Sequence, residues 1–366
     1  MAGEKVGIMT SDPVSNMMDR GIRENVFPGA VLLCAKYDKI LYHRAFGVMD
    51  LQTNHPMKTD AVFDLASLTK PLATAVAMMV LVQTRQLTLD VRLKDLLPAT
   101  IQTPKAGITL DMLLRHTSGL PAHRNFFEQA TGQPDPLAVM DHLVLTEPLM
   151  ALPGAKQVYS DLGYMLLSKV IRVVTQTRLD RFVQNHVYQP LGIEDLFFID
   201  MAAPSMPVDQ ARLVSTQNCP WRGRVLTGEV DDENAWVSGG IQGHAGLFGS
   251  ADGVHRLCLE MLQAIKYQSP QVLDPGTAAR FIQKYPGHTH VAGFDTPSQT
   301  GSSTGRYFSA LTVGHLGFTG TSFWIDPDTG AIVVLLTNRV HPSRFNLKIK
   351  KFRPAIHDCI ARCILR

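Results

Sequence analysis

Runs of apolar and β-branched residues, the types that favour strands, lie near both ends of the chain. Residues 29–37 and 40–48 are two such runs, and the turn pair Asp38-Lys39 lies between them. This pattern predicts a β-hairpin. Three later runs that are apolar or β-branched and bounded by Gly, Asp or Pro are 307–313, 321–325 and 331–337. The sequence therefore predicts strands at the two ends of the chain.

Elsewhere the apolar residues recur every three to four positions, as on one face of a helix. The run 162–174 has this spacing; 69–83 is rich in Ala and Met, 110–115 is a short apolar segment, and 16–26 and 251–266 also read as helices. The last 15 residues repeat the helical spacing at Phe352, Ala355, Ile356, Cys359, Ile360 and Cys363. These runs predict helices between the two groups of strands and one more helix at the C-terminus.

Strands at both ends and helices between them favour one arrangement, an α/β (α+β) fold. An antiparallel sheet is built from both termini and flanked by helices, and an all-helical domain is inserted. We expect residues 1–64 and 240–366 to form the sheet-plus-helix domain and residues 65–239 the inserted one. A cleft between two such parts is the expected place for a small-molecule site.

Composition excludes several classes of protein. The chain has 366 residues, of which 45% are hydrophobic and 18% charged, with a net charge of +3. It can bury a large core, and without a stripe of basic and aromatic residues we expect no nucleic-acid partner. Residues 1–13 lack the apolar core of a signal peptide, and the most apolar run, 71–82, is shorter than the ~20 residues of a membrane span. We expect no membrane partner.

The cysteines point to a compartment. Five of them, an odd number, are spread thinly at Cys34, Cys219, Cys258, Cys359 and Cys363. This usage predicts buried free thiols in a reducing environment and not a disulfide framework. Together with the missing signal peptide it predicts a cytoplasmic protein.

Ser67 and Lys70 form the single S-x-x-K in the chain. Positions i and i+3 of a helix share a face, so Lys70 would lie one turn from the Ser67 hydroxyl. A serine becomes nucleophilic when a base or a nearby cation activates it. A helix N-cap serine followed by a surface lysine is the alternative that this stretch alone favours.

Two further stretches could join this pair. Tyr159 and Asp161 precede the predicted helix 162–174, and a tyrosine beside cations can act as a general base. The run GHLGFTG at 314–320 ends one predicted strand and turns into the next. Its glycines would allow backbone N–H groups to approach a ligand, and His315 could polarise that ligand. A half-buried core tyrosine and an ordinary hairpin turn are the alternatives.

Other motifs give less evidence of function. The G-x-S-x-G at 301–305 lacks the strand before it and the helix after it that a nucleophile elbow needs, so we expect a flexible loop. His288 and His290 lie in a Pro/Gly loop without a matching carboxylate or cysteine, and we expect a solvated loop and no metal. His244 could line the cleft or be structural. Asp232, Glu233 and Asn234 are expected to fix their loop against the helical domain. No nucleotide or other cofactor motif is present.

Taken together, the motifs SLTK, YSD and HLG occur in the order of S-x-x-K, Y-x-N and K/H-T-G. With the surroundings FDLASLTKPLAT, KQVYSDLGYMLLSKVI and GHLGFTGTSFWIDP, the chain resembles the serine β-lactamase and penicillin-binding-protein superfamily, nearest its class C and esterase-like branch. The stretch GEVDDENAWVSGGIQGHAGLFGS is similar to a subgroup of β-lactamase-related serine hydrolases. The resemblance spans roughly residues 20–360 and implies the family's fold.

The resemblance also implies roles for residues. Ser67 would be the acylated nucleophile, Lys70 its activating neighbour, and Tyr159 the proton shuttle between Ser67, the leaving group and the hydrolytic water. The backbone N–H groups of Ser67 and Phe318 would form the oxyanion hole, with Phe318 following Gly317. His315 would lie near Tyr159 and the polar end of the substrate.

Two departures from the family pattern concern the substrate. Asp161 stands where Asn is usual, which removes an amide donor and adds a negative charge. Leu316 replaces the Thr or Ser whose hydroxyl helps to bind a substrate carboxylate. Both changes weaken the case for an anionic β-lactam or a peptide with a free carboxylate.

The sequence therefore favours a metal-free, cofactor-free serine hydrolase that acts through an acyl-enzyme on a small-molecule ester or amide. A β-lactamase or D-alanyl-D-alanine carboxypeptidase that tolerates Asp161 and Leu316 is the alternative among enzymes, with a lactam or peptide as substrate. A non-catalytic interaction module on the same fold is the alternative of another class.

Overall fold

A seven-stranded antiparallel sheet forms the centre of the computed structural model, which describes residues 12–203 and 205–365. Its strand order is β2-β1-β12-β11-β10-β9-β8. In that order the strands are β2 (Lys39–Gly47), β1 (Gly29–Lys36), β12 (Ala331–Thr337), β11 (Ser322–Asp326), β10 (Val313–Leu316), β9 (Phe294–Asp295) and β8 (His290–Val291). The N-terminal strand β1 pairs with the last strand β12. The prediction of one sheet built from both ends of the chain is confirmed.

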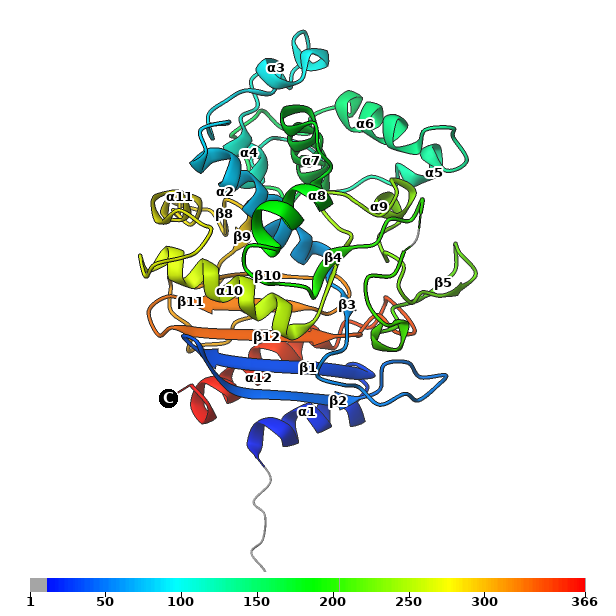
Figure 1. The fold of residues 1–366 in the computed structure, drawn as a ribbon, viewed down its shortest axis with the longest axis vertical. Coiled ribbons are helices and arrows are strands. Elements are labelled where there is room, and N and C mark those ends of the chain that lie inside the picture. Colours follow the sequence, from blue (N-terminus) through cyan, green and yellow to red (C-terminus); the bar gives the residue numbers. More distant parts are fainter. Residues whose placement is uncertain (1–11, 204, 366) are drawn as a thin grey trace, which may run out of the picture.

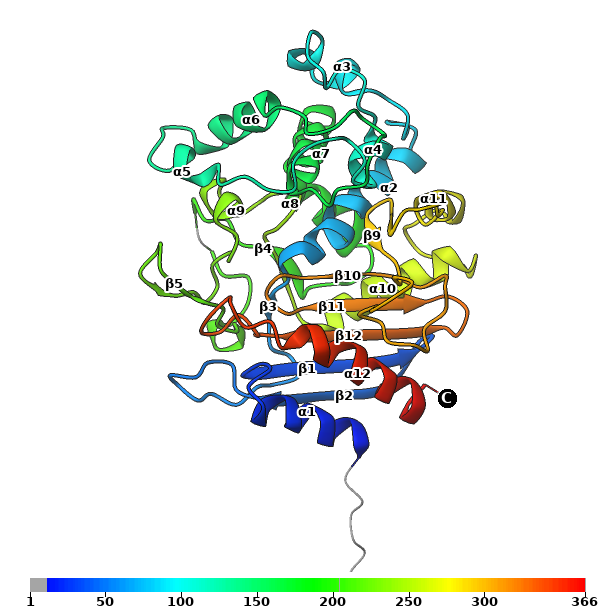
Figure 2. The ribbon, with the colours of Figure 1, turned by 180° about the vertical axis from the view of Figure 1, so that it is seen from behind.

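The two faces of the sheet are covered by different helices because successive side chains of a strand point to opposite faces. Leu32 packs in an apolar cluster that includes residues of α1 (Pro13–Arg23) and α12 (Ile349–Cys363). Its neighbour Leu33 belongs to a larger cluster that includes α10 (Ala251–Ile265). Figure 1 shows α10 across one face, and Figure 2 shows α12 across the other.

The middle of the chain is mostly helical and lies on the side of the sheet away from β2 (Figure 1). Its α-helices are α2 (Val76–Gln83), α3 (Leu93–Leu96), α4 (Leu110–Leu114), α5 (Phe127–Ala130), α6 (Pro136–Thr146), α7 (Asp161–Thr175), α8 (Leu179–Val183) and α9 (Glu233–Val237), and α11 (Pro275–Phe281) follows α10. Short strands interrupt this part and are β3 (Phe63–Asp64), β4 (Leu196–Phe198), β5 (Asn218–Cys219), β6 (Arg224–Val225) and β7 (Leu247–Gly249). The larger apolar cluster continues from the sheet into these helices, so the two parts share one core.

The predicted strand 307–313 is wrong. Residues 307–312 form a loop, and the strand β10 begins only at Val313 and runs through His315 to Leu316. Asp326 explains the loop, because its carboxylate accepts hydrogen bonds from the backbone N–H and the hydroxyl of Ser309. These bonds hold the segment in a turn although its residue types favour a strand. His315 therefore lies within a strand and not in the hairpin turn.

The other predicted elements are present with small shifts in their ends. The first hairpin turns at Tyr37 and Asp38, one residue earlier than predicted, with Lys36 opposite Lys39. The long helix predicted from residue 69 begins as a 3₁₀ turn at Ala66–Leu68 and continues as π-helix (Lys70–Ala75) before α2. This segment, Ala66–Gln83, is longer than the twelve-residue run seen in the sequence.

By length and composition Ala66–Gln83 is apolar enough to cross a membrane, but 89% of it is buried inside the protein. A buried core helix passes the same test, so the finding is weak evidence for a membrane span. All five cysteines are free, four of them buried as predicted, while Cys363 is exposed. The predicted absence of a signal peptide concerns residues 1–13, of which 1–11 lie outside the described residues.

Candidate active site

Ser67 follows a backbone turn that other groups hold in place. The preceding residue, Ala66, has φ 48°, in the left-handed region that side chains with a Cβ rarely adopt. Its N–H donates to the Asp64 carboxylate at 2.8 Å, and its carbonyl accepts from the Thr69 hydroxyl at 2.6 Å. Such strain persists where the surroundings impose it, and it is common at active sites. The turn leaves Ser67 half-buried in the wall of a pocket.

Lys70 is fully buried three residues further on. Its Nζ donates to Ser67 Oγ at 3.1 Å, to Asp161 Oδ1 at 2.7 Å and to the carbonyl oxygen of His244 at 3.1 Å. An ammonium group has three N–H donors, so these three acceptors satisfy it completely. The structure thus brings Lys70 to Ser67, as the spacing predicts, and also pairs Lys70 with Asp161.

Charge in this cluster is fixed by Asp161. Burial is the largest single influence and lowers the pKa of Lys70, but the adjacent Asp161 carboxylate, together with Tyr159, more than offsets it, so the pKa is raised. Burial would likewise raise the pKa of Asp161, and the Lys70 ammonium together with a hydrogen bond from His123 holds it well below its usual value. The resting site therefore contains a Lys70 ammonium and an Asp161 carboxylate.

Tyr159 is placed by the bonds of its two neighbours in the chain. Val158 N–H donates to the carbonyl of His116 at 2.8 Å, and Ser160 N–H donates to His116 Nδ1 at 3.0 Å. The ring centre lies 4.8 Å from Lys70 Nζ, and the phenol interacts with both Lys70 and Ser67. Burial raises the pKa of the Tyr159 phenol, and the Lys70 ammonium opposes this only in part. The phenol is protonated in the resting site.

The turn after β10 is tied to the Ser67 segment. The Thr319 hydroxyl donates to the carbonyl of Asp64 at 2.7 Å, and the Thr321 hydroxyl donates to the carbonyl of Leu65 at 3.1 Å. A Cβ on Gly317 would lie 2.0 Å from Thr321 Oγ1, so only glycine fits there. Within the described residues the Phe318 N–H has no hydrogen-bond partner, as an oxyanion donor requires.

His315 lines the same pocket and is only 3% exposed. Its Nδ1 lies 2.9 Å from the carbonyl oxygen of Leu316, while Nε2 is buried with no hydrogen-bond partner among the described residues. Burial, with the charge of Lys70, lowers the pKa of His315 well below its usual value. The ring is therefore neutral, with its proton on Nδ1 and a lone pair on Nε2.

The pocket has a volume of about 560 Å³. Six of the seven predicted site residues line it: Ser67, Tyr159, Asp161, His315, Gly317 and Phe318. Lys70 lies behind Ser67. Lining residues that the sequence did not single out for the cleft are His123, His290, Asp231, Asp232, Glu233, Asp295 and Arg344.

His290 corrects the expected solvated loop. It lies on β8 with 18% of its side chain exposed, and its ring centre is 5.7 Å from that of Tyr159. The sequence signal for this placement is slight, since single apolar residues, Val291 and Phe294, flank the pair Ala292-Gly293, whose glycine favours a turn. Residues 301–305 lie in a loop with a turn, and not at a strand-to-helix junction, and none of them lines the pocket.

The loop that carries Asp232 is fixed to the helical part and also lines the pocket. Asn234 accepts from Phe127 N–H and donates to the carbonyl of Arg124, so it fixes the loop against the helical part as expected. His244 has a structural position, since it is buried, its Nε2 lies 3.0 Å from Asp232 Oδ1, and it does not line the pocket. Asp232 itself faces the pocket.

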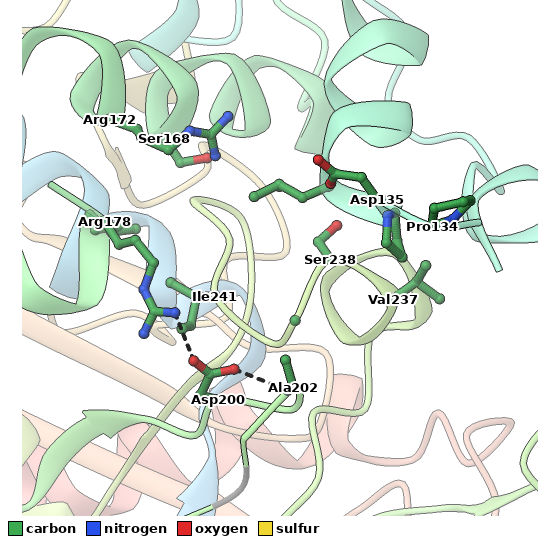
Figure 3. A pocket seen from close by; sticks show the side chains of 14 residues that line it. Pro134, Asp135, Ser168, Arg172, Arg178, Asp200, Ala202, Val237, Ser238 and Ile241 are labelled. Atoms are coloured by element: carbon green, nitrogen blue, oxygen red, sulfur yellow. Dashed lines mark hydrogen bonds and ion pairs between the residues drawn. The ribbon is translucent and has the colours of Figure 1, made fainter. Parts of the chain in front are cut away.

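A second hollow of about 400 Å³ lies between α6, α7, α8 and α9 (Figure 3). Its charged groups are already paired, with Arg178 donating to Asp200 at 2.7 Å and Arg172 bonded to Asp141. None of the predicted site residues lines it. Across residues 12–203 and 205–365 no group of three or more His, Cys, Asp or Glu side chains is arranged to hold a metal ion.

Known proteins match this chain in sequence over most of its length. The family model described as Beta-lactamase matches residues 14–353. A putative D-alanyl-D-alanine carboxypeptidase of Escherichia coli (strain K12) is 31% identical over 361 residues, which cover 89% of this chain and 82% of that protein. One of Salmonella newport is 29% identical, with 92% and 83% covered.

Solved structures show the same fold. EstCE1, described as a hydrolase with promiscuous acyltransferase activity, has a TM-score of 0.69 at 23% identity, with 93% of this chain and 97% of that chain covered. The octameric penicillin-binding protein homologue from Pyrococcus abyssi has a TM-score of 0.70 at 18% identity, with 95% and 76% covered. The match of the family model and the 31% identity to the Escherichia coli relative show that the chain belongs to the β-lactamase family and is a serine hydrolase of that family.

Proposed function

We propose that the protein hydrolyses esters, and amides less readily, through an acyl-enzyme on Ser67. The observation that carries the proposal is the contact between the Ser67 hydroxyl and the Lys70 ammonium at 3.1 Å, in a pocket also lined by Tyr159 and the unpaired N–H of Phe318. This set contains a nucleophile, a cation beside it, a proton carrier and an oxyanion donor.

Acylation needs no ionised base in this proposal. Ser67 Oγ bonds to the substrate carbonyl carbon and gives its proton to the Tyr159 oxygen, while the phenol passes its own proton to the leaving oxygen or nitrogen. The Lys70 ammonium donates to Oγ and stabilises the negative charge that develops there. The backbone N–H groups of Ser67 and Phe318 receive the carbonyl oxygen as it becomes an oxyanion. The carbon–oxygen or carbon–nitrogen bond then breaks and the alcohol or amine leaves.

Deacylation reverses the proton path. A water molecule attacks the ester carbon of the acyl-enzyme and gives a proton to Tyr159, which returns one to Ser67 Oγ as the bond to carbon breaks. The products are the acid and free Ser67. Lys70 stays protonated throughout, because Asp161 remains ionised beside it.

The second candidate is a β-lactamase or D-alanyl-D-alanine carboxypeptidase, which the names of the relatives favour. Asp161 and Leu316 speak against it, since Asp161 lacks the amide donor that would meet a substrate carbonyl and Leu316 lacks the hydroxyl that would help to bind a substrate carboxylate. A carboxypeptidase must bind such a carboxylate at the end of its peptide. We therefore place ester hydrolysis first.

The test is acylation followed by intact mass spectrometry. The wild type, Ser67→Ala and the control Ser303→Ala are incubated with a fluorophosphonate and, separately, with a penicillin. Ser303 is the central serine of the G-x-S-x-G, so it is the matched alternative nucleophile.

We expect a fluorophosphonate adduct on the wild type and on Ser303→Ala and none on Ser67→Ala. A stable, Ser67-dependent penicillin adduct would reverse the order of the two candidates. No adduct with either reagent would refute both and favour a non-catalytic role. Turnover of short nitrophenyl esters beside nitrocefin then separates an esterase from a β-lactamase.

A further inference from the structure

One N–H of the proposed oxyanion hole belongs to an exposed residue. Phe318 is 47% exposed, so its own packing holds it only weakly. Gly317 and Gly320 close the turn around it, because the carbonyl of Gly317 accepts from the Gly320 N–H at 3.1 Å. The middle peptide group of such a turn, which here carries the Phe318 carbonyl, has no hydrogen bond within the turn. Its orientation therefore depends on a partner outside the turn.

Arg339 is that partner. Strands β11 and β12 pair with Ser322 opposite Leu335, and the same register continued beyond the strands places Arg339 opposite Phe318. The Nη2 group of Arg339 donates to the Phe318 carbonyl, and the guanidinium carbon lies 4.8 Å from the centre of the Phe318 ring. Arg339 thus holds both the main chain and the side chain of the same residue.

The Nη1 group of Arg339 is bonded to a separate segment. It donates to the carbonyl of Arg344 at 2.9 Å and to that of Asn346 at 2.8 Å. The Asn346 amide donates in turn to the carbonyls of Asn25 and Val26, at 3.1 Å each, in the connection between α1 and β1. The planar guanidinium therefore ties the turn to a part of the chain that is itself fixed.

These bonds are the main use of the Arg339 charge. The residue is 5% exposed, and burial lowers the pKa of Arg339 while the charge of Asp231 opposes this only in part. The Asp231 carboxylate is bonded to Arg344 instead. A buried cation is costly, and this one is spent on backbone carbonyls. Arg339 does not line the pocket, so it acts on the main chain and not on the substrate.

We infer that Arg339 is a positioning residue for the oxyanion hole, because its hold on the carbonyl and the ring of Phe318 fixes the direction of the Phe318 N–H. The carbonyl and the N–H belong to one residue, so a rotation of the first displaces the second. The inference rests on the proposed function, in which this N–H receives the carbonyl oxygen of the substrate. It assigns to the reaction a residue that lies outside the pocket.

The test compares nitrophenyl butanoate with its thionoester, in which sulfur replaces the carbonyl oxygen. Sulfur is larger and a weaker hydrogen-bond acceptor, so a well-placed oxyanion hole favours the ester. The two kcat/KM values are measured on one preparation and share the same concentration of folded enzyme. Their ratio therefore reports on the oxyanion hole even where a variant is partly unfolded.

Arg339→Met keeps an alkyl stem and loses the guanidinium. We expect kcat for the ester to fall by about 10²-fold with a much smaller change in KM, as for an interaction made only in the transition state. The ester-to-thionoester ratio should fall by about tenfold or more. Arg339→Lys keeps the charge but cannot bond three carbonyls through a planar fork, so both quantities should fall by less than in Arg339→Met.

The matched control is Arg115→Met. Arg115 is 1% exposed, donates to the carbonyls of Arg280 and Gln283, and has its guanidinium carbon 4.2 Å from the ring centre of Tyr285. It does not line the pocket, so its loss should lower stability and leave the ester-to-thionoester ratio unchanged. A wild-type ratio in both Arg339 variants would overturn the inference, as would an equal fall of the ratio in Arg115→Met.

The two proposals fail in different ways. If no ester is hydrolysed in a Ser67-dependent manner, the proposed function is wrong and the inference falls with it. If ester hydrolysis depends on Ser67 but the Arg339 variants keep the wild-type ratio, the proposed function stands and only the inference is wrong.

Discussion

Replacing Asp161 by asparagine isolates the charge that keeps Lys70 protonated. The two charged atoms are 2.7 Å apart, and Lys70 is fully buried. At an effective dielectric constant of about 20, two unit charges at this separation attract by about 6 kcal/mol. Asparagine retains a carbonyl acceptor for Nζ but removes this attraction. Burial then lowers the pKa of Lys70 with no full negative charge at this position to oppose it.

The consequence is a stability that depends on pH. In the wild type the pKa of Lys70 in the folded protein is raised above 10.5. The stability that the Lys70–Asp161 pair gives the folded protein is therefore fully present below pH 10.5 and is lost as the pH rises through the pKa of the folded state. In Asp161→Asn the folded pKa lies below 10.5, so the unfolded chain binds more protons between the two values. The stability of the variant relative to the wild type then rises with pH by about 1.4 kcal/mol per unit. At neutral pH the variant should be less stable by about 3–5 kcal/mol.

Urea unfolding followed by tryptophan fluorescence at pH 7.5, 8.5 and 9.5 measures this difference. The double variant Lys70→Met/Asp161→Asn lacks the titrating amine and should show no slope. Asp141→Asn, whose partners Lys169 and Arg172 are partly exposed, should show none either. A difference between Asp161→Asn and the wild type that stays constant over the three pH values would refute the argument that Asp161 sets the charge of Lys70.

Three further outcomes are expected. Tyr159→Phe should lower kcat by about 10²–10⁴ in steady-state ester hydrolysis while far-UV circular dichroism stays unchanged, because the proton carrier is lost and the ring is kept. Gly317→Ala should lower single-turnover acylation by about 10²–10³, because its Cβ would meet Thr321 Oγ1 at 2.0 Å and displace the Phe318 N–H; an unchanged rate would argue against that donor. Burial raises the pKa of Asp295 from 3.8 to about 7, so wild-type stability falls as pH rises between these values. The Asp295→Asn variant lacks this fall, and its melting temperature relative to the wild type should increase from pH 5 to pH 8.

The sheet was predictable because its central strands carry a strong local signal. Strands β1 and β12 are buried on both faces, so long apolar and β-branched runs mark them in the sequence. β10 carries no such signal, since its four residues include Gly314 and His315 and it is held by pairing with its neighbours. The run at 307–313 has suitable residue types, yet the Asp326 carboxylate captures Ser309 in a turn. Tertiary contacts decided both positions.

The residues of the site likewise fall into those that the sequence predicts and those that it does not. Ser67 and Lys70 are three residues apart, so helical spacing alone brings them together, and the resemblance to a family supplies Tyr159 and Asp161. His290, Asp295 and Arg344 belong to no motif, and only the packing of distant segments brings them to the pocket. The strain at Ala66 was equally hidden, because an alanine gives no sign that its φ is positive.

The charge state of the site also bears on how far the names of its relatives can be carried over. A carboxypeptidase pocket must offer donors or cations to the terminal carboxylate of its substrate. Here the pocket offers a carboxylate on Asp161 and an alkyl side chain on Leu316, and its arginine, Arg344, is already bonded to Asp231 and Glu233. Neither Asp161 nor Leu316 can donate a hydrogen bond. Acyl transfer depends on the nucleophile and the oxyanion hole while selectivity depends on the charges that surround them, so the same chemistry at Ser67 is compatible with more than one class of substrate.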